Sequence, residues 1–86
     1  GNAYKKQQEI VIALSGAFDV VIKNEHGEEE KISLNRSYNG VYLPPMTWRR
    51  LENFSTNSLA LHISSEKFTE DDYIRDFEDF LKYKNG

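Results

Sequence analysis

Short runs of strand-forming residues, each ended by turn residues, fill positions 1–65 of this 86-residue chain. Phe18, Val20 and Ile22 alternate with Asp19 and Lys23 at the period of two typical of a half-buried strand. Other runs that predict strands lie at residues 8–14, 31–34, 41–43, 48–54 and 59–64. The prolines at 44 and 45 end one of them, because neither has an N–H to donate to a ladder. The spacing of the turns favours a sandwich or barrel.

The last part of the chain has the pattern of an amphipathic helix. Thr69 precedes three acidic residues, as a helix N-cap does, and Phe68 and Tyr73 hold the two positions of a hydrophobic staple. Apolar residues then recur at helical spacing, at Tyr73, Ile74, Phe77, Phe80 and Leu81. We therefore predict a helix over residues 70–83, after strands over residues 8–64, in a single domain that spans residues 1–86. Strands first and one helix last predict a mainly-β fold.

Composition narrows the classes of function. Eleven basic and 14 acidic residues give a net charge of -3, which offers no basic face for nucleic acid. The longest apolar run, residues 10–14, is far shorter than the roughly 20 residues of a membrane span. The sequence has no cysteine, and its two histidines form no His-x-His motif, so a metal site is disfavoured. We expect a soluble cytoplasmic protein that acts without nucleic acid, membrane or metal cofactor.

Three segments carry more specific information than periodicity does. They are Ile-Ala-Leu-Ser-Gly at 12–16, Pro-Pro-Met-Thr-Trp-Arg at 44–49 and Asp-Tyr-Ile-Arg-Asp at 72–76. With them the chain resembles the sugar-nucleotide 3,4-ketoisomerases, the family of WxcM-like C-terminal domains, in register from Asn2 to Tyr83. The resemblance implies a cupin-like jelly roll, usually a homodimer, that needs no metal. It also implies a reaction, the movement of a keto group from C4 to C3 of dTDP-4-keto-6-deoxyglucose, which serves surface-polysaccharide biosynthesis.

The chain departs from this family at the start of the matched region. The family pattern there is His-Ala-His-Lys-Lys, and the resemblance implies that both histidines are catalytic, whereas this chain has Asn2 and Tyr4. Asparagine does not titrate, and tyrosine, with an ordinary pKa of about 10, is a poor base at neutral pH. The family's upstream strands, with an arginine and tyrosines, are also outside this sequence. Three interpretations stay open: a relative that lost the reaction, a part of a longer polypeptide, or an enzyme that uses other groups.

Two residues are candidates for the missing proton-transfer groups. Tyr4 occupies one histidine position, and His62 shares a predicted strand face with Ala60 and Ser64. An inward His62 is the one imidazole that can replace the pair, since histidine titrates near neutral pH. The alternative is a hydrogen-bonded or partner-facing histidine. His26 lies beside Gly27 in a predicted hairpin loop, where a solvated side chain is expected.

A second group of residues is suited to binding the substrate. An indole can stack on a nucleobase and a guanidinium can bind a diphosphate with two hydrogen bonds, which makes Trp48 and Arg49 candidates. The alternative is that Trp48 is a core residue and the arginines pair with nearby glutamates. Tyr42 is either a core ring or a pocket hydroxyl, and Lys5 and Gln8 match a family strand that follows the histidines. The candidate substrate-binding residues are therefore Lys5, Gln8, Tyr42, Trp48 and Arg49.

Two functions remain in competition. The first is a member or degenerate relative of the 3,4-ketoisomerases, with a dTDP-linked sugar nucleotide as its ligand. The second is a non-catalytic cupin-like module for dimerisation or ligand binding. We count about six strands where a jelly roll has about eight. Unpaired edges and an exposed apolar sheet face would follow, and these predict a homodimer.

Overall fold

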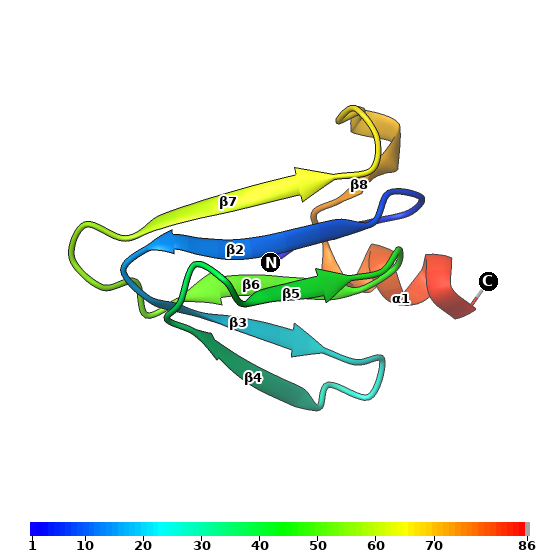
Figure 1. Cartoon of the computed structure of the whole chain (residues 1–86). Coiled ribbons are helices and arrows are strands. Elements are labelled where there is room, and N and C mark those ends of the chain that lie inside the picture. The colour runs from blue at the N-terminus through cyan, green and yellow to red at the C-terminus, as the bar shows by residue number, and fades with distance from the viewer. Residues whose placement is uncertain (86) are drawn as a thin grey trace.

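Two three-stranded antiparallel sheets face each other in the computed structural model, which describes residues 1–85 (Figure 1). The first sheet has the order β5-β2-β7, built from β2 (Glu9–Ser15), β5 (Gly40–Leu43) and β7 (Leu59–Ser64). The second has the order β4-β3-β6, built from β3 (Phe18–Lys23), β4 (Glu29–Leu34) and β6 (Trp48–Glu52). A small third sheet pairs β1 (Ala3–Tyr4) with β8 (Tyr73–Ile74). The predicted mainly-β fold is confirmed. No helix among these residues is long and apolar enough to cross a membrane.

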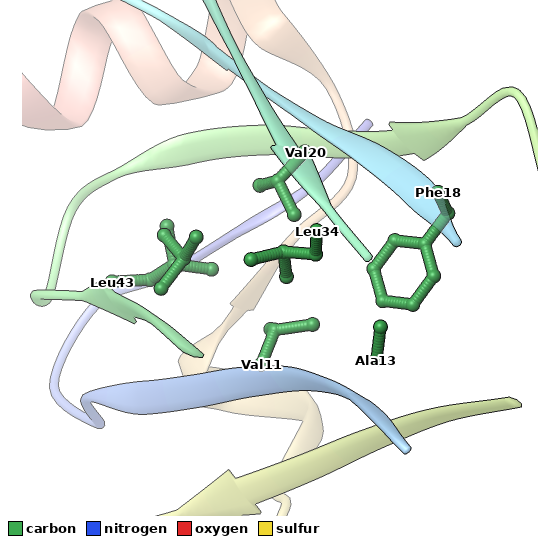
Figure 2. Packing of buried hydrophobic residues seen from close by; sticks show 7 residues of the cluster. Val11, Ala13, Phe18, Val20, Leu34 and Leu43 are labelled. Carbon is green, nitrogen blue, oxygen red and sulfur yellow. The ribbon is translucent and has the colours of Figure 1, made fainter. Parts of the chain in front are cut away.

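The main hydrophobic core fills the space between the two facing sheets (Figure 2). Alternate residues of each strand point into it, as the period of two in the sequence predicts. Val11 and Val20, from opposite sheets, are both completely buried. The buried members are Val11, Ala13, Phe18, Val20, Leu34, Val41 and Leu43. Burial of each large side chain contributes about 1.5–3 kcal/mol, so this layer holds the two sheets together.

A second core lies outside the sheets, where the helix α1 (Phe77–Asn85) covers the start of β6. The ring of Trp48 lies 5.3 Å from that of Phe77 and 5.7 Å from that of Phe80, measured between centroids. Ala3 and Ile74 complete the cluster from β1 and β8. The apolar stripe predicted for the helix is therefore a packing surface within one chain.

The predicted start of the helix at residue 70 is wrong. Residues 70–72 form one turn of 3-10 helix, Tyr73 and Ile74 pair with β1, and α1 begins only at Phe77. Thr69 makes no side-chain capping bond, and the carboxylate of Asp72 instead accepts the backbone N–H of Lys6 at 2.7 Å. The long-range sheet pairing therefore takes the residues that local pattern assigns to the first helical turns.

Candidate active site

A polar cluster occupies one end of the space between the two sheets. Its centre is Glu9 on β2, and Arg49 reaches it from β6 on the facing sheet. His62 and Ser64 lie on β7, directly opposite Val11 and Glu9 in the antiparallel register. Residues directly opposite each other share one face of a sheet, so both β7 side chains lie on the inner face. The pairing thus brings together three residues far apart in sequence.

The carboxylate of Glu9 has three polar neighbours. Arg49 Nη1 lies 3.4 Å and His62 Nδ1 lies 3.3 Å from its Oε1 atom, and the hydroxyl of Ser64 donates to Oε2 at 3.3 Å. Glu9 is 5% exposed and Arg49 is 2% exposed, so the ion pair is interior. Burial acts to raise the pKa of Glu9, but His62, Arg49 and Ser64 together hold that pKa below its ordinary value. The carboxylate is therefore charged at neutral pH.

Tyr4 adjoins this cluster from β1. The guanidinium carbon of Arg49 lies 5.2 Å from the centre of the Tyr4 ring, a cation–π arrangement. Burial and the nearby charge of Glu9 raise the pKa of the Tyr4 phenol. A phenol that stays protonated can donate a hydrogen bond but is no base near neutral pH. Arg49 Nε and Nη2 are buried without a hydrogen-bond partner among residues 1–85, which leaves donor capacity inside the domain.

The other predicted site residues lie elsewhere. Trp48 is in the second core, 8% exposed, which gives it a packing role. Gln8 and Tyr42 lie beside a small hollow of about 230 Å³, where the tyrosine hydroxyl donates to Gln8 Oε1 at 2.5 Å. Lys5 lines a cleft of about 410 Å³ at α1, with its ammonium 4.8 Å from the ring centre of Tyr83. The structure thus brings together three of the seven predicted site residues, Tyr4, Arg49 and His62.

Sequence reasoning missed Glu9, the residue on which the cluster centres. A signal was present, because Glu9 continues the inward series of Val11 and Ala13 at a period of two. A charge at an inward position needs an interior partner, and Arg49 supplies it. His26 lies in the exposed turn between β3 and β4, as predicted. Within residues 1–85, no three histidine, aspartate or glutamate side chains are grouped to hold a metal ion.

Comparison with known proteins shows which family the chain belongs to and which solved structures share its fold. Residues 1–85 match the family model described as FdtA: WxcM-like, C-terminal. A TDP-4-oxo-6-deoxy-alpha-D-glucose-3,4-oxoisomerase from Aneurinibacillus thermoaerophilus is 29% identical over 82 residues, which cover 95% of this chain and 58% of that protein. A 3,4-ketoisomerase crystal structure from Helicobacter canadensis superposes with a TM-score of 0.91 at 30% identity, over 99% of this chain and 63% of that one.

A third relative is a variant of the 3,4-ketoisomerase QdtA from Thermoanaerobacterium thermosaccharolyticum, solved in complex with TDP-4-keto-6-deoxyglucose. It has a TM-score of 0.90 at 32% identity, over 95% of this chain and 59% of that one. The fold is thus the cupin-like fold of the sugar 3,4-ketoisomerases. The chain belongs to the FdtA family of WxcM-like C-terminal domains. It spans about three-fifths of the length of these relatives.

Proposed function

We propose that this chain is a sugar-nucleotide-binding domain of the 3,4-ketoisomerase type, with dTDP-4-keto-6-deoxyglucose or a close analogue as its ligand. The polar cluster of Glu9, Arg49 and His62 carries the proposal, because it is an interior polar site in a fold whose relatives are named for this reaction. The cytoplasmic location expected from the sequence stays a prediction.

The proposed reaction needs proton transfer and no external oxidant or reductant. The C3–H bond breaks, an enediol forms, a C4–H bond forms, and the hydroxyl proton passes from the C3 oxygen to the C4 oxygen. Histidine is suited to such transfers near neutral pH. The side chain of His62 is 46% exposed, so its imidazole is accessible to a ligand. Tyr4, with its raised pKa, is suited to donate a hydrogen bond to a sugar oxygen.

Loss of the family's histidine pair does not by itself argue against ligand binding. The QdtA variant solved with TDP-4-keto-6-deoxyglucose has a histidine replaced by asparagine, and another structure of that enzyme contains TDP. Asn2 is an asparagine at a histidine position of the family pattern. These structures support binding by a domain with an altered histidine. Catalysis is a separate question, which requires an assay of turnover with TDP-4-keto-6-deoxyglucose.

We predict that TDP binds the purified chain saturably in isothermal titration calorimetry and that the chain isomerises TDP-4-keto-6-deoxyglucose. The variant His62→Asn should keep TDP binding and lower turnover by about 10²–10⁴-fold, the usual effect of losing a general base. His26→Asn changes an exposed loop histidine in the same way and should leave both unchanged. Absence of TDP binding at millimolar concentration would contradict the proposal. Binding without turnover would favour a non-catalytic ligand-binding module.

We also propose that the chain forms a homodimer through the outer face of the sheet β5-β2-β7. This face presents apolar side chains in register, in rows such as Tyr42–Ile10–Ile63. Ile10 is 40% exposed, Ile63 49% and Tyr42 55%. The outer face of the other sheet instead carries ion pairs, among them Lys31 with Glu52. An uncharged apolar face is matched by a second copy of itself, as a two-fold interface requires.

Sedimentation equilibrium should find a dimer at micromolar concentration, and Ile63→Lys should shift it to a monomer. The lysine would place a charge at the middle of an apolar contact, where it cannot be solvated. Ser33→Lys, on the exposed face of the charged sheet, should leave the dimer intact. A wild-type chain that sediments as a monomer at these concentrations would contradict the proposed interface.

A further inference from the structure

The imidazole of His62 lies between a buried carboxylate and the open side of the domain. Its Nδ1 atom is 3.3 Å from Glu9 Oε1, and its side chain is 46% exposed whereas that of Glu9 is 6% exposed. One ring nitrogen is therefore engaged from the interior. Nε2, the nitrogen that Glu9 does not engage, is the one left for a ligand.

We infer that Glu9 is a positioning residue that holds His62 as the base of the reaction, by accepting the Nδ1–H of its neutral ring. This inference rests on the proposed function. In a neutral imidazole one nitrogen carries hydrogen and the other accepts it, so a carboxylate at Nδ1 selects the tautomer with a free Nε2. When Nε2 takes the C3 proton, the imidazolium that forms lies beside a negative charge. The same nitrogen then returns the proton to C4.

The surroundings of Glu9 keep it fixed and charged while His62 changes its protonation state. Arg49 holds the carboxylate from β6, and Ser64 donates to its other oxygen from β7. Tyr4 on β1 and Tyr73 on β8 are further titratable groups near Arg49, and the raised pKa of the Tyr4 phenol keeps it neutral near pH 7. Arg49 is the cation that pairs with Glu9, so an imidazolium formed on His62 by proton transfer would be a second positive charge beside the same carboxylate.

A purely structural role for the contact is the competing interpretation. The pair of Glu9 and Arg49 already balances the interior charge, so the fold has no electrostatic need of a third, half-exposed ionisable group. His62 lies on β7, which is at the edge of its sheet. A histidine that only tied β7 to β2 through Nδ1 would have the same tautomer. The tautomer therefore tests the contact with Glu9, and loss of catalysis in a Glu9 variant separates the positioning role from the structural one.

The tautomer is measurable without a ligand. Two-bond ¹H–¹⁵N correlation spectra of the labelled full chain should show His62 with hydrogen on Nδ1, with His26, in its exposed turn, as the internal reference. Hydrogen on Nε2 of His62 would overturn the inference, whatever the outcome of TDP binding. This measurement uses the unmodified chain, so it stands even if a variant at Glu9 does not fold.

Catalysis is tested by exchange of the C3 hydrogen of TDP-4-keto-6-deoxyglucose with D₂O. Glu9→Gln keeps the size of the side chain but removes its charge, and it should lower kcat for exchange by about 10²-fold with KM little changed. Unchanged kcat in a folded variant would overturn the inference and leave the proposed function standing. Failure of the wild type to bind TDP would overturn the proposed function, and the role of Glu9 in this reaction with it.

Discussion

Replacing Arg49 by methionine is expected to lower the free energy of unfolding by about 3–5 kcal/mol. The substitution leaves Glu9 as an uncompensated charge in the interior, 5% exposed, with only His62 and Ser64 as polar neighbours. Domains of this size are stable by roughly 0.05–0.15 kcal/mol per residue, so the loss is a large share of the total. Guanidinium denaturation followed by far-UV circular dichroism measures it.

The neighbouring arginine is a matched control. Arg50 has more carboxylate partners than Arg49, since it pairs with both Glu29 and Glu52, but these pairs are partly exposed to solvent on the outer face of the sheet. Exposed ion pairs contribute little to stability, so Arg50→Met should shift the denaturation midpoint far less than Arg49→Met. Equal effects of the two substitutions would mean that burial is not what makes the Arg49–Glu9 pair important.

Removing both charges should recover most of the loss. The double variant Glu9→Leu with Arg49→Met replaces the buried pair by apolar side chains of similar volume, which in other proteins is neutral or stabilising.

The dependence of stability on acidic pH tests the same ion pair independently. The pKa of Glu9 is lowered in the folded state, so its stabilising effect is present above the ordinary value of 4.5 and is lost as the pH falls through the folded-state value. This acid-dependent loss should be absent from the double variant.

The sequence predicts the strands well because the buried side chains of a half-buried strand recur at every second position. Phe18 and Val20 of β3 lie in the main core at alternate positions, and β7 lies at 59–64 as predicted. The helix boundary could not be predicted in the same way. Tyr73 and Ile74 have helical spacing to Phe77, but they gain more by pairing with β1, about 70 residues earlier in the chain. Local propensity is a weak preference that long-range pairing overrides.

For the candidate site, too, local sequence pattern predicts part of the arrangement, and long-range contacts decide the rest. Alternation along β6 requires Arg49 and Arg50 to point to opposite faces, but it does not say which of the two points inward. The answer depends on α1, which covers Trp48 on the outer face and so places Arg49 inside. The alternative that the arginines pair with glutamates is what the structure shows. Glu9 was missed because its partner lies 40 residues away on the facing sheet.

The aromatic cluster beneath α1 should be the most sensitive apolar site of the domain. Phe80 is completely buried between Trp48 and Phe77, with centroid distances of 5.7 Å and 5.6 Å. Phe80→Ala would leave a cavity at the contact that holds the helix, and should cost about 3–5 kcal/mol. Since Trp48 is the single tryptophan, its fluorescence reports directly on this cluster during thermal unfolding.

Phe68→Ala removes the same side chain from an exposed position. Phe68 is 54% exposed and contacts Tyr4 and Tyr73 at the edge of the domain, so its loss leaves no comparable cavity. The melting temperature should therefore fall much further for Phe80→Ala than for Phe68→Ala. An equal fall would mean that α1 does not depend on this core. If α1 alone detaches in Phe80→Ala, Trp48 fluorescence should change at a lower temperature than the circular dichroism signal of the strands. Coincident transitions would instead show that the second core and the two facing sheets unfold as one unit.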